Sequence, residues 1–127
     1  MEVEKLIKTV IDCAYIVRRN LTPGYLESVY KNALIFELEE HGITDILTEV
    51  PLKVNYKGNT IGEFRADIII ENKLIIELKA ISQLTLMHEI QLVNYLATTG
   101  MDYGILINFG GTKLEVKRKY REYNCVS

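Results

Sequence analysis

The chain of 127 residues contains few cysteines and no long hydrophobic run, and both absences exclude classes of protein. Its two cysteines, Cys13 and Cys125, lie far apart and show neither C-x-x-C nor cysteine–histidine spacing. A zinc site and a disulfide framework are therefore not indicated, and a reducing cytoplasm is the simplest location for free thiols. The chain opens without the segments of a signal peptide, and no apolar run approaches membrane-spanning length. We expect a cytoplasmic protein that does not bind a membrane.

The chain also lacks a strong charge of either sign. Its 15 basic and 17 acidic residues give a formal net charge of −2, so there is no overall attraction for nucleic acid. A nucleic-acid partner would have to be met by a local basic patch or by a bound metal ion. No glycine-rich phosphate loop follows a strand and no Ser/His/Asp arrangement is present, which argues against a small-molecule enzyme. The hydrophobic share of 48% is typical of one globular domain, here residues 1–127.

Apolar periodicity predicts three helices. The first spans Glu2–Asn20, the second begins near Tyr25 or Leu26 and ends near Gly42, and the third ends at Gly100. The third helix is expected to pack through one apolar stripe, made of Leu86, Ile90, Val93 and Ala97. Its second stripe is polar and is either an exposed face or part of a site: His88, Gln91 and Tyr95.

Alternating hydrophobicity predicts five strands. Three of them form an antiparallel meander across Glu49–Ala80, and Pro51 places the first at a sheet edge. The apolar run Gly104–Phe109 is typical of a buried strand, which the helix before it would place parallel to the strand that holds Glu77. The last strand carries a basic cluster that suits either phosphate contact or, more simply, defence of a sheet edge: Lys113, Lys117, Arg118, Lys119 and Arg121.

The stretch RADIIIENKLIIELKA, residues 65–80, reads as a hairpin with three charged residues in its strands. If its turn is the three-residue loop 71–73, Ile70 pairs with Leu74, and counting back sets Asp67 opposite Glu77. Glu77 and Lys79 share one face of their strand, because successive residues alternate.

Two opposed carboxylates at about 5 Å repel by roughly 3 kcal/mol at an effective dielectric constant near 20, whereas a good cross-strand pair contributes only about 0.2–1 kcal/mol. A divalent cation between Asp67 and Glu77 would turn this repulsion into coordination, and Lys79 could orient a water molecule beside it. The alternative is a solvated sheet face on which both acids point outward. The residues alone leave both interpretations open.

Glu27 lies on the first turn of the second helix, where it has two explanations. Negative charge there complements the helix dipole. If this turn abuts the face that carries Asp67 and Glu77, Glu27 could instead supply a third carboxylate, and Gly24 would allow a close approach of the backbone.

Four pieces of sequence together resemble a known superfamily. Asp67 followed by Glu77-Leu78-Lys79 resembles the D…(D/E)-x-K signature of the PD-(D/E)XK nucleases, without the proline of the superfamily's name. Residues 24–30, GYLESVY, resemble the G-x-x-E-x-x-Y motif of the small GxxExxY family within it. Residues 91–95, QLVNY, resemble a Q-x-x-x-Y helix motif of several branches, and residues 104–119 look like the last strands of the GxxExxY family.

The resemblance implies a restriction-endonuclease-like αβββαβ core and metal-dependent phosphodiester cleavage. By it, Asp67, Glu77, the Leu78 carbonyl and Glu27 would bind Mg²⁺ or Mn²⁺, and Lys79 would position or activate the attacking water. It assigns three further residues to the substrate side: Gln91 and Tyr95 beside the site, and Tyr30 packed or hydrogen-bonded near Glu27.

Two functions of different class follow. The favoured one is a nuclease acting on DNA, with RNA open, and it would act alone, as a homodimer or with a recruiting protein partner. The alternative is a nucleic-acid- or protein-binding module that keeps the nuclease fold without turnover, which the mild acidity of the chain suits.

Overall fold

The computed structural model describes residues 1–121, which form three helices and five strands. The helices are α1 (Val3–Asn20), α2 (Glu27–Glu40) and α3 (Leu86–Thr99). The strands are β1 (Ile46–Tyr56), β2 (Asn59–Ile70), β3 (Leu74–Lys79), β4 (Tyr103–Asn108) and β5 (Glu115–Tyr120). Every predicted element is therefore present. Cys13 is a buried free thiol in α1, and Cys125 lies outside the described residues.

The five strands form one mixed sheet in the order β1-β2-β3-β4-β5. The first three run antiparallel as predicted, β4 lies parallel to β3 after the α3 crossover, and β5 closes the far edge antiparallel to β4. Pro51 lies in the edge strand β1, which confirms the position predicted for it. The chain thus has the expected α/β architecture.

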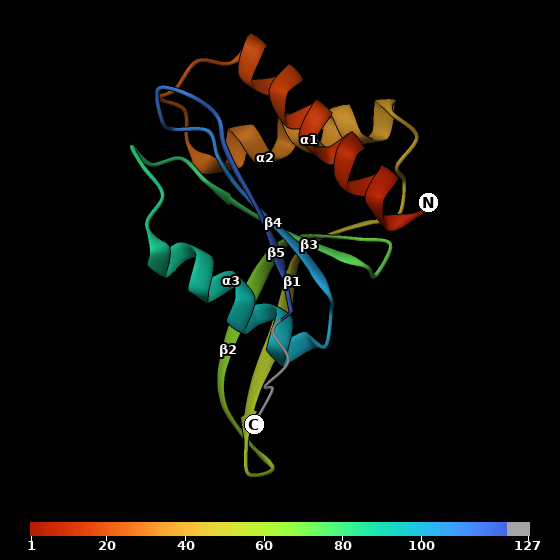
Figure 1. Cartoon of the computed structure of the whole chain (residues 1–127), viewed down its shortest axis with the longest axis vertical. Helices are drawn as coiled ribbons and strands as arrows, with labels where there is room; N and C mark the ends of the chain where they lie inside the picture. The colour runs from red at the N-terminus through yellow and green to blue at the C-terminus, as the bar shows by residue number, and fades with distance from the viewer. Residues whose placement is uncertain (122–127) are drawn as a thin grey trace.

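Helices cover both faces of this sheet, with α1 and α2 on one side and α3 on the other (Figure 1). Alternate residues of β3 serve the two layers. Leu74, Ile76 and Leu78 pack with α1 and α2, whereas Ile75 packs with Leu92 and Leu96 of α3. The alternation predicted for β3 is confirmed, and Glu77 and Lys79 follow Ile75 on the side of α3.

The stripe predicted to bury α3 is wrong. Leu86 is 69% exposed and Ile90 41% exposed, and Ala97 also faces solvent. The helix instead packs through Leu92 and Leu96, which a reading of spacing alone assigns to neither stripe. Because α3 carries apolar residues on more than one side, periodicity cannot identify the side that the sheet selects.

The loop after Lys79 is held against the end of β4 by two sequence features. A Cβ atom on Gly110 would lie 2.4 Å from the backbone of Ile81, so only glycine permits this approach. The fully buried Asn108 accepts a hydrogen bond from the Ile81 N–H and donates one to its carbonyl, each 3.0 Å long. These contacts fix the direction in which the chain leaves Lys79.

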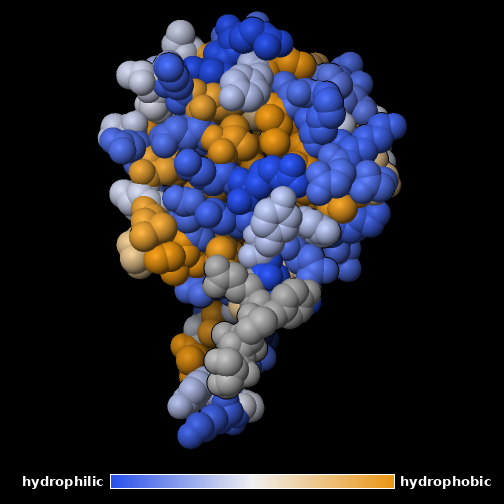
Figure 2. All heavy atoms as spheres, in the orientation of Figure 1, coloured by the Kyte–Doolittle hydropathy of each residue, from blue (hydrophilic) through white to orange (hydrophobic). Residues whose placement is uncertain are grey.

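The β1–β2 hairpin projects from the body of the molecule (Figure 1). Its outer part carries exposed Tyr56 and Ile61, and the surface there mixes hydrophilic and apolar side chains (Figure 2). The basic residues of β5 are largely neutralised by neighbours: Arg118 pairs with Glu4 at 3.0 Å and Lys119 with Glu89 at 2.6 Å. The surface around β5 therefore has less free positive charge than its sequence suggests.

Candidate functional site

The strands β2 and β3 part at the two acidic residues. Their ladder consists of Ile70–Leu74, Ile69–Ile75 and Ile68–Ile76, so the register predicted from a three-residue turn is confirmed. One residue beyond this ladder, the carboxyl groups of Asp67 and Glu77 accept hydrogen bonds from backbone N–H groups. The Leu78 N–H donates to Asp67 Oδ2 at 2.8 Å, and the Asp67 N–H donates to Glu77 Oε1 at 3.3 Å. The carboxyl groups of Asp67 and Glu77 are therefore held at the fork between the strands.

Burial and mutual repulsion raise the pKa of both carboxyl groups. Glu77 is only 7% exposed, and burial first and the charge of Asp67 second raise its pKa to about 8. Burial also raises the pKa of Asp67, against the hydrogen bond from the Leu78 N–H. The interaction between the two carboxyl groups adds to the rise in the pKa of Glu77 and opposes the rise in that of Asp67, so Glu77 is the member of the pair that more readily keeps a proton. A proton kept there would relieve the repulsion that the sequence predicts.

Glu27 and Lys79 complete the charged cluster. Glu27 is the first residue of α2, and its side chain is exposed overall. Partial desolvation of its carboxyl group first and the charge of Asp67 next raise its pKa, while Lys79 lowers it. The charge of Lys79 also lowers the pKa of Asp67 and of Glu77, so this lysine lies near enough to act on all three acids. A cavity of about 250 Å³ opens at this point, lined by Glu27, Ser28, Lys31, Glu49 and Asp67.

Glu49 is a site residue that sequence reasoning missed. It lies in β1 between Thr48 and Val50, which pair with Ile68 and Ala66, so the register sets it across from Asp67. Its φ of 51° is unusual for a residue other than glycine. Strand alternation predicts only that Glu49 belongs to the polar side of β1, and no local signal announces this backbone conformation.

Tyr95 approaches the acids from α3. Burial raises the pKa of its phenol first, the charges of Glu77 and Asp67 add to the rise, and a hydrogen bond with the Gln91 side chain opposes it. Its ring stacks on Phe64 of β2 with the centroids 3.6 Å apart. Gln91 and Tyr95 therefore lie on the flank of the cluster.

Tyr30 and His88 are occupied elsewhere. The Tyr30 side chain is completely buried, and its hydroxyl donates to the Thr22 carbonyl at 2.5 Å and accepts from the Tyr25 N–H at 3.2 Å. The Tyr30 hydroxyl is therefore engaged with the loop that precedes Glu27, and the roles predicted for Tyr30 at the site stay predictions. His88 accepts from the Thr85 N–H at the start of α3, so it caps the helix.

The donor atoms of the cluster suit a hard divalent cation, which prefers carboxylate and carbonyl oxygens. Within residues 1–121, however, no three Asp, Glu, His or Cys side chains already converge as a finished metal cage. Two oxygens of the acid pair accept hydrogen bonds from backbone N–H groups, and burial and the charge of Asp67 raise the pKa of Glu77 to about 8. A cation that binds both carboxylates would displace any proton that Glu77 keeps, so binding and deprotonation are coupled.

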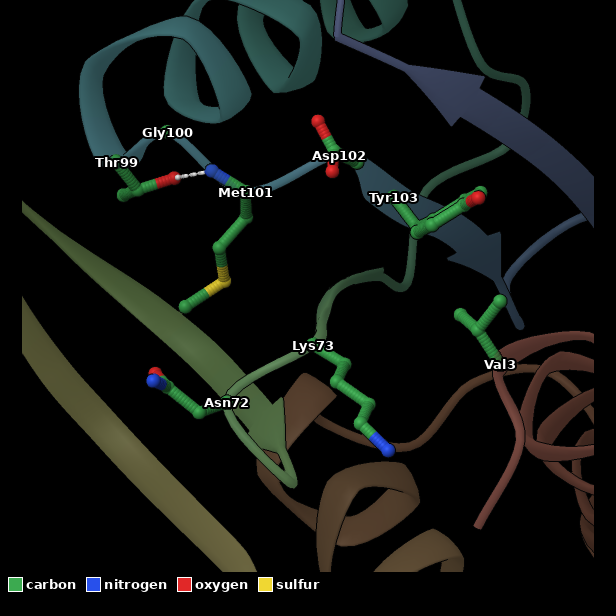
Figure 3. Close-up of a pocket in the computed structure, with 8 residues that line it drawn as sticks. All are labelled: Val3, Asn72, Lys73, Thr99, Gly100, Met101, Asp102 and Tyr103. Carbon is green, nitrogen blue, oxygen red and sulfur yellow. Dashed lines mark hydrogen bonds between the residues drawn. The ribbon is translucent and has the colours of Figure 1, made fainter.

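A second cavity, of about 370 Å³, lies near the turn end of β3 (Figure 3). Its charged lining residues are Lys73 and Asp102. Lys73 Nζ donates to the Met1 carbonyl at 2.8 Å, and Asp102 pairs with Arg121 at 2.9 Å. This cavity offers paired charges and no opposed carboxylates.

A mixed sheet between helical layers, with an acid pair and a lysine at a strand fork, defines a restriction-endonuclease-like α/β protein. The family model described as "PD-(D/E)XK nuclease superfamily" matches residues 4–119. The chain therefore belongs to the PD-(D/E)XK nuclease superfamily.

One solved structure, described as "Crystal structure of SSO0001", resembles the chain with a TM-score of 0.56 and 21% identity. The match covers 76% of this chain and 50% of that one, so the chain spans about half the length of the solved protein. At this identity the likeness shows a shared fold. A comparison with curated proteins finds none that matches. No helix within residues 1–121 is long and apolar enough to cross a membrane.

Proposed function

We propose that the protein is a metal-dependent nuclease that hydrolyses phosphodiester bonds of DNA. The observation that carries this proposal is the buried pair of Asp67 and Glu77, which face each other at the fork with Lys79 beside them. Opposed buried acids lower stability, so their presence favours a functional role, and strongly perturbed pKa values favour a catalytic site. Membership of the nuclease superfamily supports the same chemistry.

Asp67 and Glu77 would hold Mg²⁺ or Mn²⁺, with the Leu78 carbonyl and Glu27 as further ligands. When bound, this ion supplies charge neutralisation at the phosphate and lowers the pKa of bound water. Lys79 positions the attacking water and stabilises the negative charge that develops on the phosphoryl oxygens. The water oxygen forms the new bond to phosphorus and its proton passes to solvent or to a neighbouring carboxylate. The bond to the leaving oxygen breaks, and that oxygen takes a proton from solvent. Gln91 and Tyr95 flank the substrate.

We also propose that the chain belongs to the GxxExxY family, since Gly24, Glu27 and Tyr30 stand at its motif positions. The fully buried Tyr30 braces the loop that leads to Glu27, which gives the spacing of the motif a physical reason. DNA is the proposed substrate, and RNA is to be tested beside it as an alternative substrate.

A non-catalytic binding module is the alternative function. It is favoured by the pairing of the basic residues of β5 with acidic neighbours, which leaves little positive charge to hold nucleic acid. The same observation suits a nuclease that a protein partner or a second copy brings to its substrate.

Cleavage assays with Lys79→Met and Lys73→Met test the proposal. The two lysines lie at opposite ends of β3, so both variants remove the same charge from the same hairpin. On single-stranded, duplex and branched DNA, and on RNA, with Mn²⁺ present, we expect wild type and Lys73→Met to cleave alike and Lys79→Met to lose at least about 10²-fold in rate. Absence of cleavage by the wild type on every substrate would favour the binding module.

A further inference from the structure

The first turn of α2, which carries Glu27, has weak local support. Its N-cap residue, Leu26, makes no side-chain capping hydrogen bond. Glu27, Ser28 and Val29 are all exposed, and burial of the helix begins only at Tyr30. A turn without a cap or a buried side chain frays readily. The position of Glu27 relative to Asp67 therefore needs support from elsewhere.

Lys31 supplies a link from this turn to the sheet. It lies four residues after Glu27 and thus on the same side of α2. Its ammonium group pairs with Glu49 Oε1 of β1, and the Lys31 side chain is only 17% exposed. Among the ion pairs seen within residues 1–121, this one joins α2 to the sheet.

The backbone of Glu49 takes an unusual conformation at this contact. Its φ of 51° departs from the strand on both sides, although Thr48 and Val50 keep their ladder partners in β2. A non-glycine residue in this conformation is costly and persists where the surroundings enforce it. The departure is confined to the residue across from Asp67, and both members of the ion pair line the cavity that Glu27 and Asp67 share.

We propose that the Lys31–Glu49 ion pair is a positioning device that holds the first turn of α2, and with it Glu27, at Asp67. In this role neither residue touches the metal ion or the substrate, and both act through Glu27. The inference deepens the proposed nuclease function and rests on it for the role of Glu27, but the attachment of α2 to β1 can be measured without metal or substrate.

The test uses Lys31→Met, Glu49→Gln and the charge swap Lys31→Glu/Glu49→Lys. Hydrogen exchange over residues 25–34 is followed in EDTA, and Mn²⁺ affinity is measured by calorimetry. Each single variant should speed exchange and weaken Mn²⁺ binding by about threefold to tenfold, and the swap should return both to within about twofold of wild type. Lys8→Met, which breaks the exposed Lys8–Asp12 pair of α1, should change neither.

Three results would overturn the inference. Exchange that stays unchanged in both single variants would show that the pair does not hold the turn. Weaker Mn²⁺ binding in Glu49→Gln alone, without rescue by the swap, would make Glu49 a ligand. A higher KM in Lys31→Met with unchanged Mn²⁺ affinity would make Lys31 a substrate contact. If the exchange pattern appears but the wild type neither binds Mn²⁺ nor cleaves, the positioning role stands and the nuclease assignment falls.

Discussion

The two ends of β3 treat charge in opposite ways. At the Leu74 end, Lys73 lies 3.6 Å from Glu71, and the neighbouring Asp102 pairs with Arg121. At the Lys79 end, the pKa values of Asp67, Glu77 and Glu27 are all raised, because desolvation and neighbouring acids disfavour their charged forms. One short strand therefore has charges paired with opposite charges at one end and acids placed close to one another at the other. Charged side chains pair with opposite charges at the end of β3 that has no other task. The unpaired acids at the Lys79 end therefore indicate the functional site.

The contrast is clearest in two glutamates six residues apart. A hydrogen bond from the Met1 ammonium group, helped by the charge of Lys73, lowers the pKa of Glu71. Burial and the charge of Asp67 raise the pKa of Glu77 to about 8. The surroundings of Glu71 thus favour its carboxylate form, whereas those of Glu77 favour its protonated form.

The largest expected effect is on cleavage. Glu77→Gln keeps the shape of the side chain but removes one of the proposed metal ligands, so we expect a loss of about 10²–10³-fold or more. Glu71→Gln, the matched change at the other end of the strand, should leave the rate unchanged. Initial rates with Mn²⁺ on the best substrate measure both variants. Equal losses in the two would mean that the ends of β3 do not differ in function.

The second effect is on the pH dependence of folding stability without metal. The folded pKa of Glu77, about 8, lies above its ordinary value of 4.5. The stabilisation that protonated Glu77 gives to the folded state is therefore complete below pH 4.5 and is lost as pH rises through about 8. The reason is that the unfolded chain loses this proton at a lower pH than the folded chain does. The free energy of unfolding should fall over this interval by at most about 5 kcal/mol, since each pKa unit is worth about 1.4 kcal/mol.

Urea unfolding in EDTA between pH 4 and pH 9 checks this prediction, with Glu77→Gln as the informative variant. Glutamine has no proton to lose, so the variant should keep its stability at pH 8 and exceed the wild type there. Glu71→Gln should alter the profile at the acid end instead, because a lowered pKa adds stability that disappears as pH falls. A wild-type profile that is flat from pH 5 to pH 8 would show that Glu77 is ionised in the folded protein.

The smallest effect concerns the brace behind Glu27. Tyr30→Phe leaves the Thr22 carbonyl and the Tyr25 N–H without their partner, which should cost about 1–2 kcal/mol of stability. Because Tyr30 is buried and acts only through the loop, cleavage should fall by less than about tenfold. Thermal unfolding and rates for Tyr30→Phe and for Tyr25→Phe, whose side chain is half exposed, separate the brace from a general loss of a hydroxyl. A lower cleavage rate without a loss of stability would indicate that Tyr30 contacts the substrate.

Local rules were sufficient for the hairpin and for most elements. A three-residue turn and alternation over 74–79 predict the meeting of Asp67 and Glu77, because both depend on residues close in sequence. The buried face of α3 depends on which side the sheet selects, so Leu92 and Leu96 were missed. Glu49 lies at the site with a positive φ, and Phe64 lies there because its ring stacks on Tyr95. Both features depend on tertiary structure, which a single sequence does not reveal. The burial of Tyr30 against Phe109 is of the same kind.

Calorimetric titration of Mn²⁺ at pH 7, in two buffers of different ionisation enthalpy, tests the central claim most directly. Because the pKa of Glu77 is raised to about 8, we expect the metal-free protein to keep the Glu77 proton at pH 7 and the wild type to bind Mn²⁺ with the release of about one proton. Asp67→Asn should abolish the binding, and Glu77→Gln should leave at most weak binding without proton release. Binding of equal affinity and equal proton release in wild type and Asp67→Asn would contradict a metal site at the fork of β2 and β3.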